Sequence, residues 1–469
     1  MVVRKGSIMK KFWKAVAFLT AASMVLSLGA CSQGTGTTGT SSGTASQSAG
    51  DNQGDASEDS QGGGKKYEGV TIRWQNYPAG DAQEMAKWNQ SIVDAFKEET
   101  GCTVEIVGAS WDDGLNKIMS AIASGEGPDV VQVAEQWAGQ CYSSGAFMEL
   151  DSHMDLFGGL DAYYPEALNY GQFDGVTYGL PWGGDCRAFY FTQSALDKAG
   201  LEAPTNEWTW DEMVEMLKTM KEKNGVEYPF SMEGSGSQFD VFYFWWYTML
   251  ARGGQFLSED GKTATINTEA GRQALQDIID LILVDKVLSP SMAETDPTMN
   301  SAAFQNGTAL MVPGATSIAA EALAAGVDDV MCMTPPRGEN GEFGAFLAIS
   351  VMRISNDSKN KDAALDFLAM LMSPEWQTSY NKTAGWLPAR IEAWNDEYFS
   401  TGWRANIRYG MENATAFMPG NAHAASVCRI MAAKLGEIYS SVALGTYQEG
   451  DIEKTLAAAE QEVQAELDS

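Results

Sequence analysis

The sequence predicts a mixed α/β protein whose main body folds into two lobes. Stretches with strand-like alternation are followed by stretches in which apolar residues recur at helical spacing, a pattern typical of a sheet covered by helices. The body after residue 66 is also about 400 residues long, which exceeds the usual size of a single domain.

The first part of this body contains three predicted strands, at residues 69–74, 103–107 and 129–133. Helical spacing of apolar residues between them predicts helices at residues 85–96 and 115–123. Strands that alternate with helices indicate a parallel sheet with helices on both faces. Ligands of such sheets bind where the loops meet, at the carboxyl ends of the strands.

The later elements are also visible in the pattern. Residues 179–192 form a long extended stretch, and residues 239–250 are dense in aromatic side chains. Thr209 is expected to cap a helix at residues 211–222. Further helices are predicted at residues 270–284, 361–372 and 451–467.

The chain opens with a targeting segment at residues 1–30. Basic residues precede an apolar run of about 14 residues at positions 15–28, which is typical of a signal peptide and short for a membrane span. Leu28-Gly29-Ala30-Cys31 then resembles a bacterial lipobox. The motif predicts that Cys31 becomes the mature N-terminus and carries fatty acyl chains such as palmitate, which anchor it to a membrane. An ordinary secretory signal with an incidental cysteine is the alternative.

Residues 31–66 are predicted to be a flexible linker. They consist mainly of Gly, Ser, Thr, Gln and Asp, with almost no large apolar side chain. Such a tract cannot bury enough surface to offset the entropy lost on ordering. A linker after a lipid anchor would let the folded body move above a membrane.

The charge of the chain argues against nucleic acid as a partner. It has 31 basic and 62 acidic residues, a formal net charge of −31. Nucleic-acid binding depends on Lys and Arg patches that contact phosphates. The acidic surface favours solubility, and it does not determine the charge of a binding pocket.

Neither a metal site nor a cofactor site is predicted. The chain has two histidines, and no two of its six cysteines are in CxxC spacing. Apart from Cys31, the cysteines are scattered and odd in number, so isolated buried thiols are expected. One disulfide is possible, but its pairing cannot be predicted.

Six segments resemble, in the same order, the motifs of family 1 extracellular solute-binding proteins. They include Gly125-Glu126-Gly127-Pro128-Asp129 and Gly385-Trp386-Leu387-Pro388, and they lie at residues 122–131, 179–201, 208–212, 304–311, 358–367 and 385–390. The resemblance covers nearly the whole mature chain. It implies a two-lobed periplasmic-binding-protein-like fold of type II, with a ligand held between the lobes.

The resemblance also implies where the lobes begin and end. One lobe would comprise residues 67–183 with 349–382, and the other residues 184–348 with 383–469. Three crossing segments would connect them, near residues 182–186, 346–351 and 383–388. Hinge motion about such segments closes the lobes on a ligand.

The function implied is that of the substrate-binding lipoprotein of an ABC importer. The expected cargo is a mono- or oligosaccharide, and the expected partners are the membrane permease subunits. The protein is expected to be monomeric and to sit on the extracellular face of the cell membrane of a Gram-positive bacterium.

A carbohydrate receptor needs flat aromatic surfaces and a few fixed polar groups, because sugars present apolar C–H faces and rings of hydroxyls. The 14 tryptophans of the chain suit this need. The resemblance and the strand-end positions together select these candidate ligand-binding residues: Tyr77, Asp113, Gln136, Trp137, Trp182, Asp185, Glu233, Trp245, Trp246, Gly314 and Trp386.

Several candidates have specific expected roles. Trp386 is the preferred stacking platform, and Trp137 offers another. Gln136 falls where relatives carry a hydroxyl-binding side chain. Asp185 falls where sugar-binding relatives place a carboxylate, which can accept charge-assisted hydrogen bonds. Trp182 lies beside it in the first crossing.

The remaining candidates come from loops and from the second lobe. Gly314 follows a predicted strand that ends at Met311 and would let a backbone amide approach the ligand. A sugar-binding relative has an aromatic residue near that point and this chain does not, so the identity of the cargo stays open. Trp245 and Trp246 are adjacent, so on a helix only one of them would face the cleft.

Two alternatives remain. Asp185 and Glu233 in an aromatic cleft could act as the carboxyl pair of a glycoside hydrolase. The chain has no G-x-S-x-G elbow and no phosphate-binding loop, and the resemblance concerns binding proteins, so no catalytic residue is predicted. A polyamine or another small solute is the alternative cargo, because aromatic residues with several acids would suit an amine.

Overall fold

The computed structural model describes residues 64–111, 113–235, 240–258 and 261–469. Residues 63–469 form one compact unit, and the fold below is that of the described part of this unit. Not one helix in these ranges combines the length and the apolarity needed to cross a bilayer.

The predictions for the N-terminal region fall almost entirely outside this description. The signal peptide at residues 1–30, the acylated Cys31 and the linker up to residue 63 lie outside the described residues.

The first sheet has five strands in the order β2-β1-β3-β10-β6. β1 is parallel to β2 and β3, whereas β10 is antiparallel to both β3 and β6. The parallel arrangement predicted for the first three strands is therefore confirmed. The direction of β10 was not predicted, because a sequence pattern does not encode the direction in which a later strand enters a sheet. The strands are β1 (Thr71–Asn76), β2 (Thr103–Gly108), β3 (Val130–Val133), β6 (Leu180–Cys186) and β10 (Leu347–Ile354).

The second sheet is smaller and antiparallel. β7 (Ala188–Thr192) lies at its centre, between β8 (Met311–Gly314) and β9 (Val330–Met333). β8 begins at Met311, so the predicted strand end at this residue was wrong, and Gly314 closes the strand. A separate hairpin pairs β4 (Gln172–Phe173) with β5 (Val176–Thr177).

The three predicted crossing segments lie side by side. β6 of the first sheet and β7 of the second are separated by Arg187 alone. Leu347 of β10 is paired with Cys186, and Leu387 exchanges backbone hydrogen bonds of 2.7 and 3.2 Å with Gly184. A Cβ at Gly184 would collide with the Ala348 carbonyl oxygen, so glycine permits this close approach.

The helices begin and end at the signals that the sequence carries. The Asp81 carboxylate accepts from the backbone N–H groups of Gln83 and Glu84 at the start of α1, and Gly101 ends this helix in the left-handed conformation. Thr209 and Glu212 form a capping box at the start of α6. The predicted cap at Thr209 is thus confirmed.

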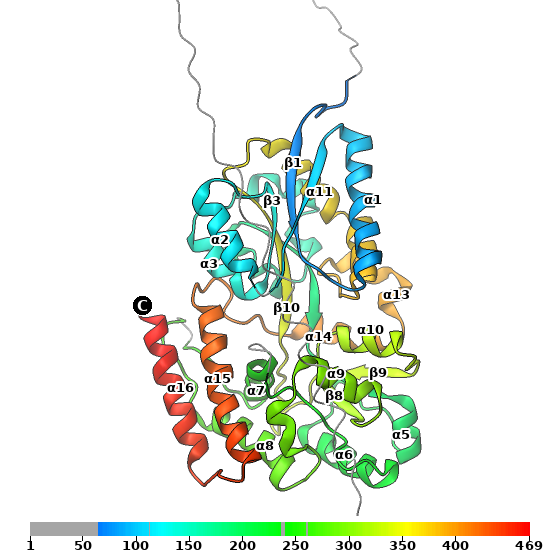
Figure 1. Ribbon diagram of the computed structural model, residues 1–469, viewed down its shortest axis with the longest axis vertical. Helices are drawn as coiled ribbons and strands as arrows, with labels where there is room; N and C mark the ends of the chain where they lie inside the picture. The colour runs from blue at the N-terminus through cyan, green and yellow to red at the C-terminus, as the bar shows by residue number, and fades with distance from the viewer. Residues whose placement is uncertain (1–63, 112, 236–239, 259–260) are drawn as a thin grey trace, which may run out of the picture. The chain divides into compact units, whose positions relative to one another are not determined.

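Figure 1 shows α1, α2, α3 and α11 around the first sheet, and α5 to α10, α15 and α16 around the second. The α-helices are α1 (Ala82–Thr100), α2 (Gly114–Ser124), α3 (Ala138–Ser143), α4 (Pro165–Leu168), α5 (Gln193–Ala199), α6 (Trp210–Asn224), α7 (Asp240–Leu250), α8 (Glu269–Leu283), α9 (Pro297–Gln305), α10 (Ser317–Ala324), α11 (Lys361–Met372), α12 (Pro374–Ala384), α13 (Glu397–Ser400), α14 (Gly402–Asn413), α15 (Ala424–Ala443) and α16 (Asp451–Leu467). The short 3-10 helices are η1 (Glu135–Trp137), η2 (Asp151–Phe157), η3 (Leu160–Ala162), η4 (Pro290–Glu294) and η5 (Ile391–Asn395).

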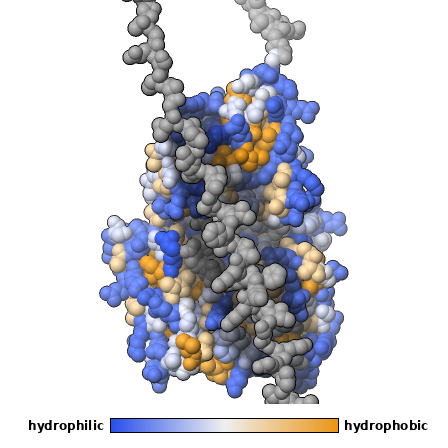
Figure 2. Space-filling model, in the orientation of Figure 1, coloured by the Kyte–Doolittle hydropathy of each residue, from blue (hydrophilic) through white to orange (hydrophobic). Residues whose placement is uncertain are grey.

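Three hydrophobic clusters hold these elements together. One packs α1, α11 and α12 against the first sheet, and another packs α6, α7, α8, α15 and α16 around the second. A third joins residues of both sheets, among them Val133, Cys186 and Val312. The face in Figure 2 is mainly hydrophilic outside scattered apolar patches. Within the described ranges, all five cysteines are buried and free, as expected for isolated thiols.

Candidate functional site

Four aromatic side chains come together at one edge of the first sheet: Tyr77, Trp111, Trp137 and Trp386. We call them the aromatic cluster. Trp111 stacks on Tyr77 with ring centroids 4.4 Å apart, and its centroid lies 6.1 Å from that of Trp137 and 6.2 Å from that of Trp386. Such spacings are typical of interacting rings.

The cluster follows from the topology of the sheet. Tyr77 comes directly after β1, Trp111 follows β2, and Trp137 lies in η1 after β3. Because these strands are parallel, their carboxyl ends meet at one edge and bring the three rings together. Trp386 is supplied by the chain after α12.

Polar groups fix two of these rings in place. The Gln75 amide donates to the Tyr77 hydroxyl at 2.8 Å, and the Trp111 indole N–H donates to the Pro78 carbonyl at 2.9 Å. Tyr77 and Trp137 are 1% and 5% exposed, whereas Trp111 and Trp386 are only partly buried. Trp111 and Trp386 therefore offer the accessible surface of the cluster.

A second group surrounds Arg187, the residue between β6 and β7. Its guanidinium forms ion pairs with Asp185 and, at 2.7 Å, with Asp240 at the start of α7. Glu135 and Glu233 lie close enough to interact electrostatically with Arg187. We call these five residues the charged cluster: Glu135, Asp185, Arg187, Glu233 and Asp240.

Burial raises the pKa values of three acids in this cluster. Desolvation raises the pKa of Glu135 to about 7, although Arg187 acts in the opposite direction. Desolvation and the nearby Asp240 raise the pKa of Glu233 to about 9. The pKa of Asp185 is also raised by burial, against the influence of Arg187. Glu233 is thus mainly protonated at neutral pH.

The two clusters meet at η1. Its first residue, Glu135, belongs to the charged cluster, and its last, Trp137, belongs to the aromatic cluster. Gln136 lies between them and is buried, and its amide nitrogen, when turned toward Glu135, donates to Oε1 at 2.8 Å. One short helix therefore connects a stacking surface to fixed polar groups.

A cavity of about 370 Å³ adjoins the charged cluster. It is lined by Glu233, Asp240 and residues of α9 and α10. A much smaller void beside it is lined by Arg187, Glu233, Asp240 and Gly314, among others. α10 also lies close to the segment that carries Trp386. A Cβ at Gly385, the residue before Trp386, would lie 3.5 Å from the Ala320 side chain of α10.

The structure brings seven of the predicted site residues into this region. Tyr77, Trp137 and Trp386 are in the aromatic cluster, Asp185 and Glu233 are in the charged cluster, Gln136 lies between the clusters, and Gly314 lines the small void.

The prediction for Trp182 needs correction. It is 0% exposed and packs in the core against Tyr380 and Trp88, with ring centroids 4.3 and 6.1 Å apart. Trp182 lies where the register of β6 against β10 shifts, and its ring enters the core beside the first sheet, whereas Asp185 on the same strand pairs with Arg187.

Trp245 and Trp246 also need correction, because both are core residues. Trp245 is 0% exposed and donates its indole N–H to the Gly271 carbonyl at 2.9 Å. Trp246 is 2% exposed and packs on Phe346 and Phe417. α7 is apolar nearly all round, so the rule that one of two neighbours faces outward does not apply here.

Asp113 lies outside both clusters. It immediately precedes α2, accepts from the Ser110 hydroxyl and forms an exposed ion pair of 2.9 Å with Lys117. These hydrogen bonds lower the pKa of Asp113. Its contacts are those of a surface residue at a helix start.

The site residues predicted from the sequence did not include Trp111, Glu135, Arg187 and Asp240. Trp111 could have been found, since it follows the second predicted strand as Tyr77 follows the first. Arg187 could also have been found, since residues two apart on an extended chain share a face and it comes two residues after Asp185. Asp240 carries no such signal, because only the tertiary fold brings α7 to Arg187.

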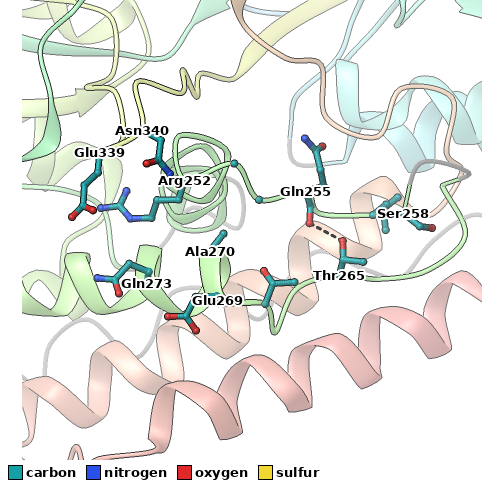
Figure 3. Close-up of a pocket in the computed structure, with 13 residues that line it drawn as sticks. Arg252, Gln255, Ser258, Thr265, Glu269, Ala270, Gln273, Glu339 and Asn340 are labelled. Atoms are coloured by element: carbon teal, nitrogen blue, oxygen red, sulfur yellow. Dashed lines mark hydrogen bonds between the residues drawn. The ribbon is translucent and has the colours of Figure 1, made fainter.

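A larger cavity of about 660 Å³ lies elsewhere and shares no lining residue with either cluster. Figure 3 shows Arg252, Glu269, Gln273 and Glu339 around it, and Gln255, whose carbonyl accepts from the Thr265 hydroxyl at 2.7 Å. None of its described lining residues is aromatic, so it offers no stacking surface.

The chain belongs to the bacterial extracellular solute-binding proteins, because the model of this family matches residues 65–378. The family resemblance seen in the sequence is thus confirmed. Members of this family are solute-binding proteins rather than enzymes.

Curated relatives are similar over most of their length. The diacetylchitobiose-binding protein of Streptomyces coelicolor is 24% identical over 71% of this chain and 77% of its own. The maltotriose-binding protein of Pyrococcus abyssi is 25% identical over 70% and 68%. A protein of Sinorhizobium fredii, named as a probable amino-acid ABC transporter periplasmic-binding protein, is 29% identical over 71% and 75%.

Solved structures share the fold. The sugar-binding protein MalE of Xanthomonas citri aligns with a TM-score of 0.74 and 18% identity, covering 85% of this chain and 98% of that one. The GacH receptor of Streptomyces glaucescens aligns with a TM-score of 0.71 and 19% identity, covering 85% and 99%. At these identities the likeness shows the fold, which is the two-lobed α/β fold predicted from the sequence.

Proposed function

We propose that this protein is the carbohydrate receptor of an ABC importer. The observation that supports this best is the aromatic cluster, in which partly exposed Trp111 and Trp386 lie beside buried Tyr77 and Trp137. Flat rings next to fixed carboxyl and amide groups suit the apolar faces and hydroxyls of a sugar. Diacetylchitobiose and maltotriose, named for two relatives, are both oligosaccharides.

Capture would occur by closure of the two lobes. We propose residues 67–183 with 349–382 as one lobe and residues 184–348 with 383–469 as the other. A ligand that touches Trp111 in the first lobe and Trp386 or the cavity in the second binds the closed form better than the open form. This difference in affinity is what shifts the equilibrium toward closure.

The N-terminal motif supports the cellular context. We propose that Cys31 is acylated after removal of residues 1–30 and that residues 31–66 tether the body to the outer face of the membrane. The lipobox-like sequence before Cys31 carries this proposal. The partners would be the permease subunits, and the receptor would act as a monomer.

A thermal-shift screen of the full chain in mild detergent tests the cargo class. The panel would hold mono-, di- and oligosaccharides with polyamines and amino acids alongside. A ligand at 100 times its Kd should add about 2.7 kcal/mol of stability. We expect a clear rise of Tm with one carbohydrate class.

Two other outcomes would each contradict part of this proposal. A shift with polyamines or amino acids alone would contradict the carbohydrate assignment. Cleavage of any oligosaccharide during the incubation, followed by chromatography, would contradict a purely binding role and favour a glycoside hydrolase.

A further inference from the structure

Among the described residues that line the cavity of about 370 Å³, acidic side chains outnumber basic ones. Three of its lining residues carry carboxyl groups: Glu233, Asp240 and Glu321. The other polar ones are hydroxyl and amide residues, and no Lys or Arg is among the described residues that line it. The space is comparable to the lower end of ligand pockets, which span roughly 300–1,000 Å³.

The charges around the cavity are only partly compensated. Arg187 is shared by Asp240 and Asp185, so one cation serves two carboxylates. Glu321 accepts from the Ser301 hydroxyl instead of pairing with a cation. The surroundings of the cavity therefore hold more acid than base.

Glu233 is the acid that most clearly lacks a partner. Its Oε2 atom has almost no solvent-exposed surface and no hydrogen-bond partner within the described part of the chain. The residue lines both the cavity and the small void beside Arg187. A buried carboxyl oxygen without a partner carries a desolvation cost that a donor from a ligand would offset.

We propose, building on the carbohydrate-binding function above, that the cavity between Glu233, Asp240 and Glu321 selects a cargo that carries a protonated amine, which makes the cargo an amino sugar or an amino-sugar oligomer. The ammonium group donates to the Glu321 carboxylate and to the unpartnered Oε2 atom of Glu233, whose carboxyl group releases its proton to solvent when the cation binds. Charge-assisted bonds of this kind are stronger than neutral ones. The ring that bears the amine extends past α10 toward Trp386.

Matched pairs of methyl glycosides test this proposal by isothermal titration of the full chain. The pairs are glucosamine with glucose, galactosamine with galactose, and mannosamine with mannose. In at least one pair we expect the amine to bind about tenfold more tightly than its neutral partner. The preference should weaken as salt is added, because screening reduces attraction between charges.

Two variants test whether the amine preference arises in this cavity. Glu233→Gln and Glu321→Gln should each reduce the amine preference about fivefold while leaving the affinity for the neutral partner unchanged. Glu84→Gln is the matched control, because Glu84 is exposed on α1 and pairs with Lys87, and it should leave the preference intact. Having two variants keeps the test valid where one of them fails to fold.

Failure of this inference can be distinguished from failure of the carbohydrate assignment. Neutral and amino sugars that bind equally in all three pairs would overturn the amine preference alone. Spermidine binding more tightly than every amino sugar would favour a polyamine cargo and overturn both. An amine preference that survives both Glu→Gln substitutions would show that it does not arise in this cavity.

Discussion

The aromatic cluster and the acid-lined cavity differ in every physical respect that bears on binding. The cluster is neutral, is built from loops at the ends of parallel strands, and leaves Trp111 and Trp386 partly exposed. The cavity is acidic, is built from two helices and a loop, and contains a buried oxygen without a partner. In the function that we propose, the first accepts many ring-shaped ligands, whereas the second discriminates by charge.

We expect the aromatic cluster to contribute mainly to affinity and the cavity mainly to specificity. Contact with an aromatic ring contributes free energy in proportion to the apolar area covered and depends little on pH. Ionic groups that are withdrawn from water cost free energy unless they are paired. We therefore expect substitutions in the aromatic cluster to weaken all ligands alike, and substitutions around the cavity to alter stability and selectivity.

Removing Arg187 should have the largest effect. Arg187→Met leaves Asp185 and Asp240 without their cation, and breaking a buried pair in this way costs about 3–5 kcal/mol. Chemical denaturation should show this loss of unfolding free energy. A loss below about 1 kcal/mol would mean that the charged cluster is better solvated than its burial indicates.

Lys87→Met provides the control for Arg187→Met. The side chains of Lys87 and Glu84 are 71% and 61% exposed, and pairs of this kind contribute about 0–1 kcal/mol. Its unfolding free energy should stay close to that of the wild type.

Trp386→Ala should have the largest effect on affinity. Loss of a stacking ring removes about 1.5–3 kcal/mol of apolar contact, which corresponds to roughly 10- to 100-fold in Kd. Titration with a neutral sugar and with an amine-bearing sugar should show the same factor for both. A loss confined to one ligand class would contradict the division of roles between cluster and cavity.

Trp245→Phe tests the comparison with a tryptophan that lies outside both regions. The change removes the hydrogen bond to the Gly271 carbonyl and leaves a small void, at a cost of about 1–2 kcal/mol of stability. The Kd for the cargo should be unchanged, because Trp245 is a core residue. A change in Kd comparable to that of Trp386→Ala would restore Trp245 as a ligand-binding residue.

Glu233→Gln should change how stability depends on pH. The pKa of Glu233 is about 9 in the folded protein, above the ordinary value of 4.5 for a glutamate, so the native state holds the proton more tightly than the unfolded state. The resulting stability is present below pH 4.5 and is lost as the pH rises toward 9. Asp240 and Asp296 raise this pKa and Arg187 lowers it.

Denaturation at several pH values measures this effect. The wild type should lose up to about 1.4 kcal/mol per pH unit relative to Glu233→Gln within that window. Parallel curves for the two proteins from pH 5 to 9 would show that Glu233 does not titrate there.

The sequence predicted the structure best where local chemistry decides the outcome. Thr209, the predicted cap, starts α6 together with Glu212, because capping depends on residues within one turn. The strand-end rule also brought Tyr77 and Trp137 together, since parallel strands end at one edge of the sheet.

It predicted the structure worst where the outcome depends on which face of an element becomes buried. Trp182 and Asp185 lie on one strand, yet Trp182 packs in the core and Asp185 pairs with Arg187, and a local pattern does not predict the register shift of this strand at Trp182. Trp245 lies on a helix that is buried on every side, which its local sequence does not distinguish from a helix at a cleft. The direction of β10 could not be predicted at all, because it depends on the path of the chain through the second sheet.

A crystal structure of the protein with the tightest-binding carbohydrate of the screen would test the central claim most directly. The account predicts a sugar ring against Trp386 and Trp111, with the group at the other end of the ligand in the cavity beside Glu233. A ligand seated instead in the cavity around Arg252 and Gln273, with the aromatic cluster empty, would contradict it.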